Sequence, residues 1–273
     1  MWVADMDFNT APCIMEAIKK RAEHGVYGYT YIDDSWRDAY ANWWSRRHNL
    51  KIDKDKLIFC TGVIPAVSSI IRAMSAPKDN VLVQIPVYNA FFNSILNNGR
   101  NILESKLVYK DGKYSIDFDD LERKMSDPKT SLMIVCNPHN PIGKIWDRET
   151  LSKIGALAKK YNVAIISDEI HCDLTDPGFK YVPFASVSDE CADVSITCIA
   201  PTKTFNIAGI KTAAIYVPNE SLNNKMIKEV KAVGIDELNV FATVATVAAY
   251  ENGEVWLDEL RQYIYENKKY AID

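Results

Sequence analysis

Apolar and polar residues follow two different periods along this chain, one typical of strands and one typical of helices. Three short apolar runs, at residues 131–135, 163–166 and 194–199, have the length and composition of buried strands. Residues 13–25 and 35–49 show helical periodicity instead, and polar residues around the start of the second stretch offer it a cap. The chain therefore combines both kinds of element.

Strand and helix signals also alternate, which is the pattern of a sheet covered by helices on both faces. In each case an apolar run leads into an amphipathic stretch. The three pairs are LIFCTG (57–62) with PAVSSIIRAM (65–74), NVLVQIP (80–86) with YNAFFNSILNN (88–98), and SLMIVCNP (131–138) with DRETLSKIGALAKKY (147–161). The run TAAIYVP (212–218) follows the preceding strand closely, so we expect it to be antiparallel to its neighbours.

Polar segments follow directly on the three buried runs. They are CNPHNPIG (136–143), SDEIHCDL (167–174) and APTKTFNIAG (200–209). Ligands of an open parallel sheet bind outside the carboxyl ends of its strands. We therefore expect Asn140, Asp168 and Lys203 to face one crevice.

An amide, a carboxylate and an amine at one site suit an aldehyde cofactor. Pyridoxal 5'-phosphate (PLP) needs a primary amine to condense with its aldehyde, an anion beside its ring nitrogen and a hydrogen-bond donor near its phenolic oxygen. Lys203, Asp168 and Asn140 can supply these groups in that order. A carboxylate within about 4–6 Å keeps the ring nitrogen protonated, which makes the ring an electron sink.

Each of these residues also has an ordinary structural interpretation. Asp168 could cap a helix, Asn140 could hold a turn between two prolines, and Lys203 could be a solvated lysine. Taken together, these interpretations would require three unrelated coincidences to reproduce one site in the right order. The combination favours a PLP site.

Seven motifs in order carry a resemblance to a known family. They are MWVADMDF (1–8), HGVYGYT (24–30), TGVIPAV (61–67), PVYNAFF (86–92), CNPHNPIG, SDEIHCDL and APTKTFNIAG. With these motifs the chain resembles the fold-type I PLP enzymes of the aspartate aminotransferase superfamily, and within them the MalY/PatB-type cystathionine beta-lyases. The resemblance spans nearly the whole chain. It implies an α/β fold with a mostly parallel seven-stranded sheet and helices on both faces, and a cis bond before Pro141.

The phosphate site has support from local physics and from the resemblance. In TGVIPAV a glycine follows a strand and a proline stands near the first helical position, which presents unpaired amides at a helix start. The resemblance places the cofactor phosphate against the amides of Gly62, Val63 and Ile64, with the Thr202 hydroxyl as a further donor. Many relatives have a serine three positions before the lysine and an arginine eight positions after it. This chain has Ala200 and Lys211 there, so phosphate anchoring is either weaker or shared with Lys211.

Two tyrosines receive roles from the resemblance alone. By pattern, an aromatic residue at a strand-to-helix junction such as Tyr88 is usually a core residue. The resemblance implies instead that the Tyr88 ring stacks on the pyridine ring. It also implies a homodimer in which Tyr29 crosses to the phosphate of the neighbouring subunit.

Composition excludes several other classes of protein. The 273 residues are 48% hydrophobic with a net charge of -4 and no basic stripe, so we expect no nucleic-acid partner. The longest apolar stretch, residues 240–250, is shorter than the roughly 20 residues that span a bilayer, and no signal peptide is visible. The six cysteines have no CxxC spacing, and His139 and His171 have no second ligand at metal spacing. We expect no metal, reduced thiols and a cytoplasmic protein, with His171 packed beside the site.

The resemblance also implies the activity, while the site chemistry leaves it open. It implies a PLP-dependent carbon–sulfur beta-lyase that converts cystathionine or related S-substituted cysteines to a thiol, pyruvate and ammonia, with Lys203 as the base. An aminotransferase would use the same three residues and is the alternative. A non-catalytic PLP-binding regulatory module or an inactive fragment is the second alternative.

The domain organisation is likewise inferred from the resemblance. Residues 1–25 form an N-terminal segment, 26–252 the large PLP-binding domain, and 253–273 the start of the helix that leads to a small domain, which we expect to be missing. In relatives that small domain carries the arginine that holds the substrate carboxylate. We therefore expect residues 1–273 alone to bind the cofactor better than they turn over substrate.

Overall fold

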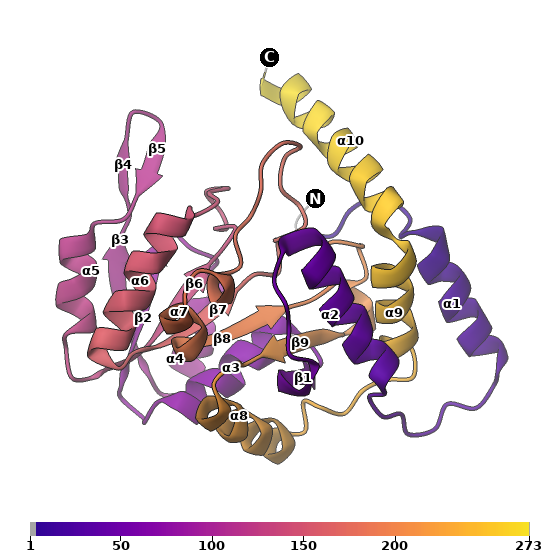
Figure 1. Ribbon diagram of the computed structural model, residues 1–273, viewed down its shortest axis with the longest axis horizontal. Coiled ribbons are helices and arrows are strands. Elements are labelled where there is room, and N and C mark those ends of the chain that lie inside the picture. Colours follow the sequence, from indigo (N-terminus) through magenta and orange to yellow (C-terminus); the bar gives the residue numbers. More distant parts are fainter. Residues whose placement is uncertain (1–3, 273) are drawn as a thin grey trace.

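The computed structural model describes residues 4–272 and is built around one seven-stranded sheet (Figure 1). Across the sheet the strand order is β1-β9-β8-β7-β6-β2-β3. These strands are β1 (Leu57–Cys60), β2 (Asn80–Ile85), β3 (Asn101–Lys106), β6 (Thr130–Cys136), β7 (Ala164–Asp168), β8 (Ser195–Ile199) and β9 (Ala213–Tyr216). A separate hairpin pairs β4 (Val108–Lys110) with β5 (Lys113–Ser115).

Strand directions agree with a mostly parallel sheet. β3, β2, β6, β7 and β8 are parallel to one another, whereas β9 is antiparallel to both β8 and β1. The expectation that residues 212–218 form an antiparallel strand is therefore confirmed. Because β1 is antiparallel to β9, it points in the same direction as β8. The carboxyl ends of β1, β2, β6, β7 and β8 thus lie at one edge.

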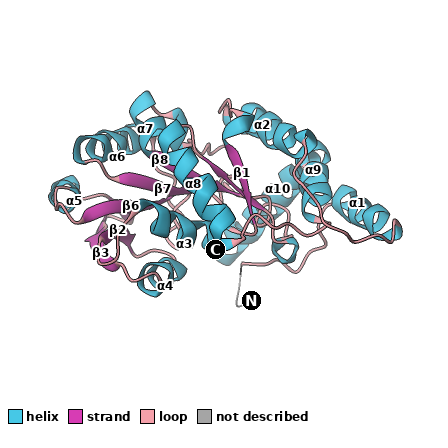
Figure 2. Cartoon of the chain, turned by 90° about the horizontal axis from the view of Figure 1, so that it is seen from below, coloured by secondary structure: helices cyan, strands magenta, loops and turns pink. Residues whose placement is uncertain are grey.

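Helices cover both faces of this sheet, as seen from below in Figure 2. One face is covered by α3 (Val63–Met74), α4 (Ala90–Asn97) and α8 (Glu220–Val233). The other is covered by α5 (Phe118–Met125), α6 (Arg148–Tyr161) and α7 (Asp189–Val194), and near β1 and β9 by α1 (Pro12–Glu23), α2 (Asp34–His48), α9 (Ala242–Asn252) and α10 (Glu254–Ile272). Three short 3-10 helices are η1 (Lys54–Lys56), η2 (Phe184–Ser186) and η3 (Ala208–Ile210).

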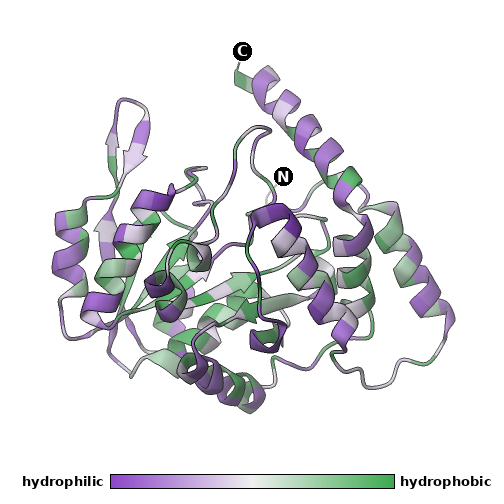
Figure 3. Ribbon diagram, viewed as in Figure 1, coloured by the Kyte–Doolittle hydropathy of each residue, from purple (hydrophilic) through white to green (hydrophobic). Residues whose placement is uncertain are grey.

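The continuous apolar runs predicted as buried strands are buried on both faces. Val81 and Val83 of β2 pack against α3 and α4, while Leu82 between them packs in the cluster that contains α5 and α6. Successive side chains of a strand point to opposite faces, so a strand that is covered on both sides needs apolar residues at every position. Figure 3 shows these central strands in green, whereas the outer surfaces of α8 and α10 are largely purple.

Polar caps fix where several of these helices begin. The Asp33 side chain accepts a hydrogen bond from the Trp36 amide at 3.2 Å and so caps α2, close to the start expected from the sequence. Asp147 caps α6 in the same way, through the Thr150 amide. One boundary differs from expectation: α3 begins at Val63, so Pro65 is its third residue. A proline is tolerated there because the first amides of a helix have no partner within the helix.

Two parts extend away from the sheet at the top of Figure 1, the β4–β5 hairpin and α10. Along α10 only Leu257 and Leu260 are buried. No helix among residues 4–272 is both long enough and apolar enough to cross a membrane. The role of α10 as an interdomain helix, and the boundaries at residues 25 and 252, stay predictions.

Candidate active site

The polar residues predicted from the sequence lie at one edge of the sheet, because the strands that precede them share a direction. The segment at Gly62 follows β1, Tyr88 follows β2, Asn140 follows β6, and Lys203 follows β8. Asp168 is the last residue of β7. All of these segments therefore lie at the carboxyl ends of the strands, the edge at which the crevice was expected.

Hydrogen bonds hold the ends of the three central strands together. In the sheet register Asp168 stands opposite Cys136 of β6 and Cys198 of β8. The Asn137 amide donates to the Asp168 carbonyl oxygen at 2.9 Å, and the Glu169 amide donates to the Cys198 carbonyl oxygen at 3.0 Å. The parallel pairing thus continues one residue beyond the strands, which fixes where the Asp168 side chain starts.

The Asp168 carboxyl is buried with little compensation. It is 4% exposed, and among the described residues it accepts one hydrogen bond, from the Ile170 amide at 3.2 Å. Burial raises the pKa of Asp168 to about 6, while the hydrogen bond acts in the opposite direction. A buried carboxyl with so few donors gains from a cationic partner, and a protonated pyridine nitrogen would be such a partner. In this respect the site fits PLP.

Asn140 lies in a loop held by its neighbours. The backbone N–H of Asn140 donates to the Cys136 sulfur at 3.5 Å. A hydrogen bond from the Gly143 backbone N–H to the His139 carbonyl oxygen closes the loop. The peptide bond between Asn140 and Pro141 is cis, as the resemblance implied, and so are those before Pro86 and Pro138.

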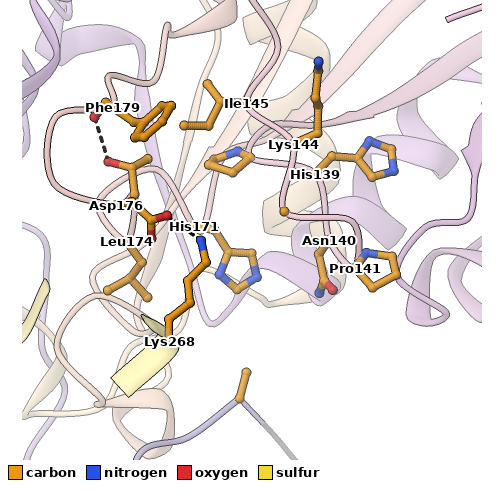
Figure 4. A pocket seen from close by; sticks show the side chains of 14 residues that line it. His139, Asn140, Pro141, Lys144, Ile145, His171, Leu174, Asp176, Phe179 and Lys268 are labelled. Carbon is orange, nitrogen blue, oxygen red and sulfur yellow. Dashed lines mark hydrogen bonds and ion pairs between the residues drawn. The ribbon is translucent and has the colours of Figure 1, made fainter. Parts of the chain in front are cut away.

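A cavity of about 700 Å³ opens beside Asn140 (Figure 4). The His171 ring lies between Asn140 on one side and Leu174 and Lys268 on the other. Lys268 forms an ion pair with Asp176, and the remaining wall is formed partly by apolar side chains such as Ile145. Among the described residues, neither Asp168 nor Lys203 lines this cavity.

His171 connects the cavity with Lys203. Burial and, to a smaller extent, the positive charge of Lys203 together lower the pKa of His171 to about 4. The imidazole is therefore neutral at physiological pH and close enough to Lys203 to sense its charge. Lys203 is half-buried in the turn between β8 and η3, and its neighbour Thr202 is buried. The expectation that His171 packs beside the site agrees with this position.

The start of α3 offers backbone donors. Gly62 precedes the helix without a side-chain cap, and the amides of Val63 and Ile64 belong to its first turn. Lys211, the residue considered for sharing the phosphate, is exposed at the end of η3, whereas Ala200 is buried.

The two tyrosines differ in exposure. Tyr88 is 39% exposed and packs its ring edge-on against Phe91 at 5.7 Å, which excludes the alternative of a core residue. Its stacking on a cofactor stays a prediction. Tyr29 is fully exposed in the connection between α1 and α2.

Two functional candidates were missed in the sequence. Asp173 and Glu169 are both buried acids of the SDEIHCDL segment, and each is surrounded by hydrogen-bond donors. Their presence in the same segment as Asp168 was a signal, but their partners are distant in sequence.

The fold and this edge define an α/β protein whose polar groups gather at the carboxyl ends of parallel strands, a common arrangement for cofactor-dependent enzymes. The sequence model of the family "Aminotransferase class I and II" matches residues 3–273, and the chain belongs to this family.

Known relatives place the chain more narrowly. It is 48% identical to the cystathionine beta-lyase PatB of Bacillus subtilis, over 99% of this chain and 70% of that protein. Among solved structures, the PLP-bound C-S lyase of Staphylococcus hominis matches with a TM-score of 0.95 and 34% identity, over 100% of this chain and 69% of that one. Cystalysin of Treponema denticola, which contains PLP, matches with a TM-score of 0.93 and 35% identity, over 98% and 68%.

Proposed function

We propose that this protein is a PLP-dependent carbon–sulfur beta-lyase that acts on cystathionine or related S-substituted cysteines. The observation that carries the proposal is the gathering of Asn140, Asp168 and Lys203 at the ends of three adjacent parallel strands. The names of the most similar relatives support the reaction type. The net reaction consumes one water, breaks the Cβ–S bond and releases a thiol, pyruvate and ammonia.

The residues of the edge have complementary tasks in this proposal. Bound PLP supplies an electron sink for the pair of electrons left when the substrate Cα loses its proton. The Asp168 carboxylate would hold the proton on the ring nitrogen, Asn140 would donate to the phenolic oxygen, and Tyr88 would pack against the ring. The amides of Gly62, Val63 and Ile64 and the Thr202 hydroxyl would bind the phosphate.

Lys203 has two tasks, attachment of the cofactor and proton transfer. Its Nζ would be the amine that holds the cofactor, and once free it would accept the proton from the substrate Cα. The neutral imidazole of His171 beside it adds no positive charge at physiological pH. The cavity beside Asn140 is open to receive the part of the substrate beyond the sulfur.

The second candidate is an aminotransferase, which the name of the matching family favours. The two activities share the proton transfer at Lys203 and differ in their products. A lyase releases pyruvate and a thiol from cystathionine, whereas an aminotransferase converts the cofactor to its pyridoxamine form. Analysis of both products in one reaction separates them.

We further propose a cytoplasmic homodimer in which Tyr29 completes the neighbouring site. Tyr29 is fully exposed, and Val26, Tyr27 and Tyr31 in the same connection are exposed as well, so this segment presents several large apolar side chains that a partner could cover. Residues 26–252 are proposed as the PLP-binding domain, and α10 as the start of a connection to a further domain.

Borohydride reduction tests the attachment site. Reduction fixes the cofactor to its lysine, and mass spectrometry then locates the modified residue. We expect the modification at Lys203, its loss in Lys203→Ala, and no change in Lys225→Ala, a control for an exposed lysine on α8. Modification of Lys203→Ala to the wild-type extent would overturn the assignment.

A further inference from the structure

A second buried carboxylate, that of Asp173, holds separate parts of the chain together through hydrogen bonds. Its side chain is fully buried. His48 Nε2 lies 2.9 Å from Oδ1, Thr204 Oγ1 donates to Oδ2 at 3.0 Å, and Trp43 Nε1 donates to Oδ1 at 3.2 Å and lies 3.3 Å from Oδ2. Three side chains from α2 and from the segment after β8 therefore converge on this one carboxylate.

This cluster is a hydrogen-bond network and no metal site. Ligand atoms of His48, Cys172 and Asp173 lie within 4.8 Å of one another, a spacing that a metal ion could bridge. Both Asp173 oxygens and His48 Nε2 are already engaged with each other or with Trp43 and Thr204. Burial also raises the pKa of Cys172 well above its usual range, so the thiol is protonated in the protein as it stands.

Contacts continue from His48 to Glu169, the residue that follows Asp168, first through ring packing and then through a hydrogen bond. The His48 ring packs edge-on against Tyr181 at 5.1 Å, and the Tyr181 hydroxyl donates to Glu169. Glu169 is fully buried and also accepts from Ser167 Oγ at 2.7 Å and from the Phe184 amide at 2.9 Å.

The two ends of the network are adjacent to the two central residues of the proposed site. Glu169 directly follows Asp168, and Thr204 directly follows Lys203. Lys203 itself lies in a turn, so no helix or strand fixes its backbone. The turn is held by hydrogen bonds from the Phe205 amide to the Pro201 carbonyl oxygen and from the Ile207 amide to the Thr202 carbonyl oxygen. The bond from Thr204 to Asp173 ties this turn to the buried interior.

We propose that Asp173 is a positioning residue, which acts through the Thr204 hydroxyl to hold the Lys203 amine at the correct place relative to Asp168. This inference rests on the proposed function, because it assumes that Lys203 binds the cofactor. The physical reason is geometric, since a misplacement of about 1 Å can cost on the order of 100-fold in rate. Asp173 itself contacts neither the cofactor nor the substrate in this proposal.

The test compares two buried threonines. Thr204→Val removes the hydroxyl that donates a hydrogen bond to Asp173, and Thr204→Ser keeps this hydroxyl. Thr246→Val is the matched control, because Thr246 is equally buried and its hydroxyl is bonded to Thr212 and to the Ala242 carbonyl oxygen, away from the network. The readout is the rate at which added PLP becomes fixed to Lys203 under borohydride, measured by mass spectrometry. Thermal unfolding checks that each variant is folded.

We expect Thr204→Val to slow this attachment by about 10-fold, the size expected when a hydrogen bond to a charged group is lost. Thr204→Ser and Thr246→Val should stay close to the wild-type rate. In turnover, kcat should fall in Thr204→Val while KM changes little. Equal attachment rates in Thr204→Val and Thr246→Val would overturn the proposal.

A double-mutant cycle separates positioning from general destabilisation. Asp173→Ala should slow attachment at least as much as Thr204→Val, and the double variant should be no slower than Asp173→Ala alone, because Asp173→Ala already removes the acceptor of the Thr204 hydroxyl. Fully additive effects would overturn the proposal. If Thr204→Val does not fold, Thr204→Ala, which also removes the hydroxyl, takes its place in the cycle. A wild-type protein that attaches no PLP at Lys203 would refute the proposed function itself, a result that is distinct from equal rates among variants.

Discussion

Asp168 and Asp173 lie five positions apart in one segment, and both side chains are almost entirely buried, yet their surroundings differ. Asp173 is surrounded by donors from Trp43, His48 and Thr204. Asp168 accepts one amide hydrogen bond among the described residues, and burial raises its pKa to about 6. Buried polar groups in proteins normally have hydrogen-bond partners, so the small number of donors around Asp168 requires an explanation.

The difference separates a structural role from a functional one. A carboxylate whose oxygens are saturated by the protein stabilises the fold and has no capacity left for a ligand. A carboxyl that is buried with few donors costs stability, and such costs are found mainly at functional sites. We therefore interpret the hydrogen bonds around Asp173 as structural support for the site, and Asp168 as a residue of the site itself.

The largest expected effect is on catalysis by Asp168→Asn. The amide has nearly the same shape but carries no charge to hold the proton on the ring nitrogen. We expect kcat to fall on the order of 10²–10³-fold, the range for loss of one electrostatic group in a catalytic site. Steady-state pyruvate release from cystathionine measures this. A variant with more than half of the wild-type rate would remove Asp168 from the proposed mechanism.

The next effect is on stability and concerns Asp173→Asn. The substitution replaces one acceptor oxygen by an NH2 donor, so a buried group that donated to that oxygen now faces a second donor and its hydrogen bond is lost. We expect the free energy of unfolding, measured in urea without added cofactor, to fall by about 3 kcal/mol. Asp258→Asn is the control: its side chain is half-exposed and bonded to Arg47, and it should cost no more than about 1 kcal/mol. Equal losses in both variants would contradict the contrast drawn between the two aspartates.

Asp168→Asn should have the opposite effect on the stability of the cofactor-free protein. The pKa of Asp168 rises from 3.8 to about 6 on folding, so its contribution is fully present below about pH 4 and is lost as the pH rises through 6. An amide at this position does not ionise. At pH 7 we therefore expect the variant to be more stable than the wild type by up to about 3 kcal/mol.

The pH dependence provides the control for this prediction. Below pH 4 the two proteins should be equally stable, because the wild-type carboxyl is then protonated in both the folded and the unfolded state. Other buried titratable groups, such as Glu169 and His171, are the same in both proteins and cancel in the difference. A difference in stability that does not change between pH 4 and pH 7 would show that burial of the Asp168 charge is not its cause.

The same contrast explains which features were predictable from the sequence. Asp168, Asn140 and Lys203 follow apolar runs that are buried on both faces, so local patterns were sufficient to place them at one edge. The antiparallel direction of β9 was predictable because its apolar run follows β8 too closely for a crossover connection. The Asp173 network was not, because its partners Trp43 and His48 are more than a hundred positions away in the sequence. Only tertiary packing brings them together.

Helix boundaries and connections were less predictable. Pro65 suggested a helix that starts at the proline, whereas α3 starts two residues earlier because a proline anywhere in the first turn costs no intrahelical hydrogen bond. The hairpin of β4 and β5 was missed, although Asp111 and Gly112 at its tip are typical of a two-residue hairpin turn, because its strands are three residues long and largely exposed. The sequence pattern alone would have assigned Tyr88 to the core, and the exposure of its side chain in the structure excludes that assignment.

Tyr29→Ala should have the smallest effect on the stability of the single subunit. It extends the comparison of the two buried aspartates to a residue whose side chain is fully exposed. Because the side chain is fully exposed, we expect the free energy of unfolding to change by less than about 0.5 kcal/mol. A contribution to the neighbouring site would nevertheless lower turnover in the assembled protein. The side chain would then matter only between subunits.

Mixed subunits test this directly. Tyr29→Ala subunits keep Lys203 but lack the crossing tyrosine, whereas Lys203→Ala subunits lack the amine but can still offer Tyr29 to a neighbour. When the two variants are dissociated and reassociated together, a hybrid dimer contains one site with both residues intact. Pyruvate release should therefore rise above that of either variant alone. No recovery, in hybrids shown by mass to have formed, would mean that Tyr29 acts within its own subunit or not at all.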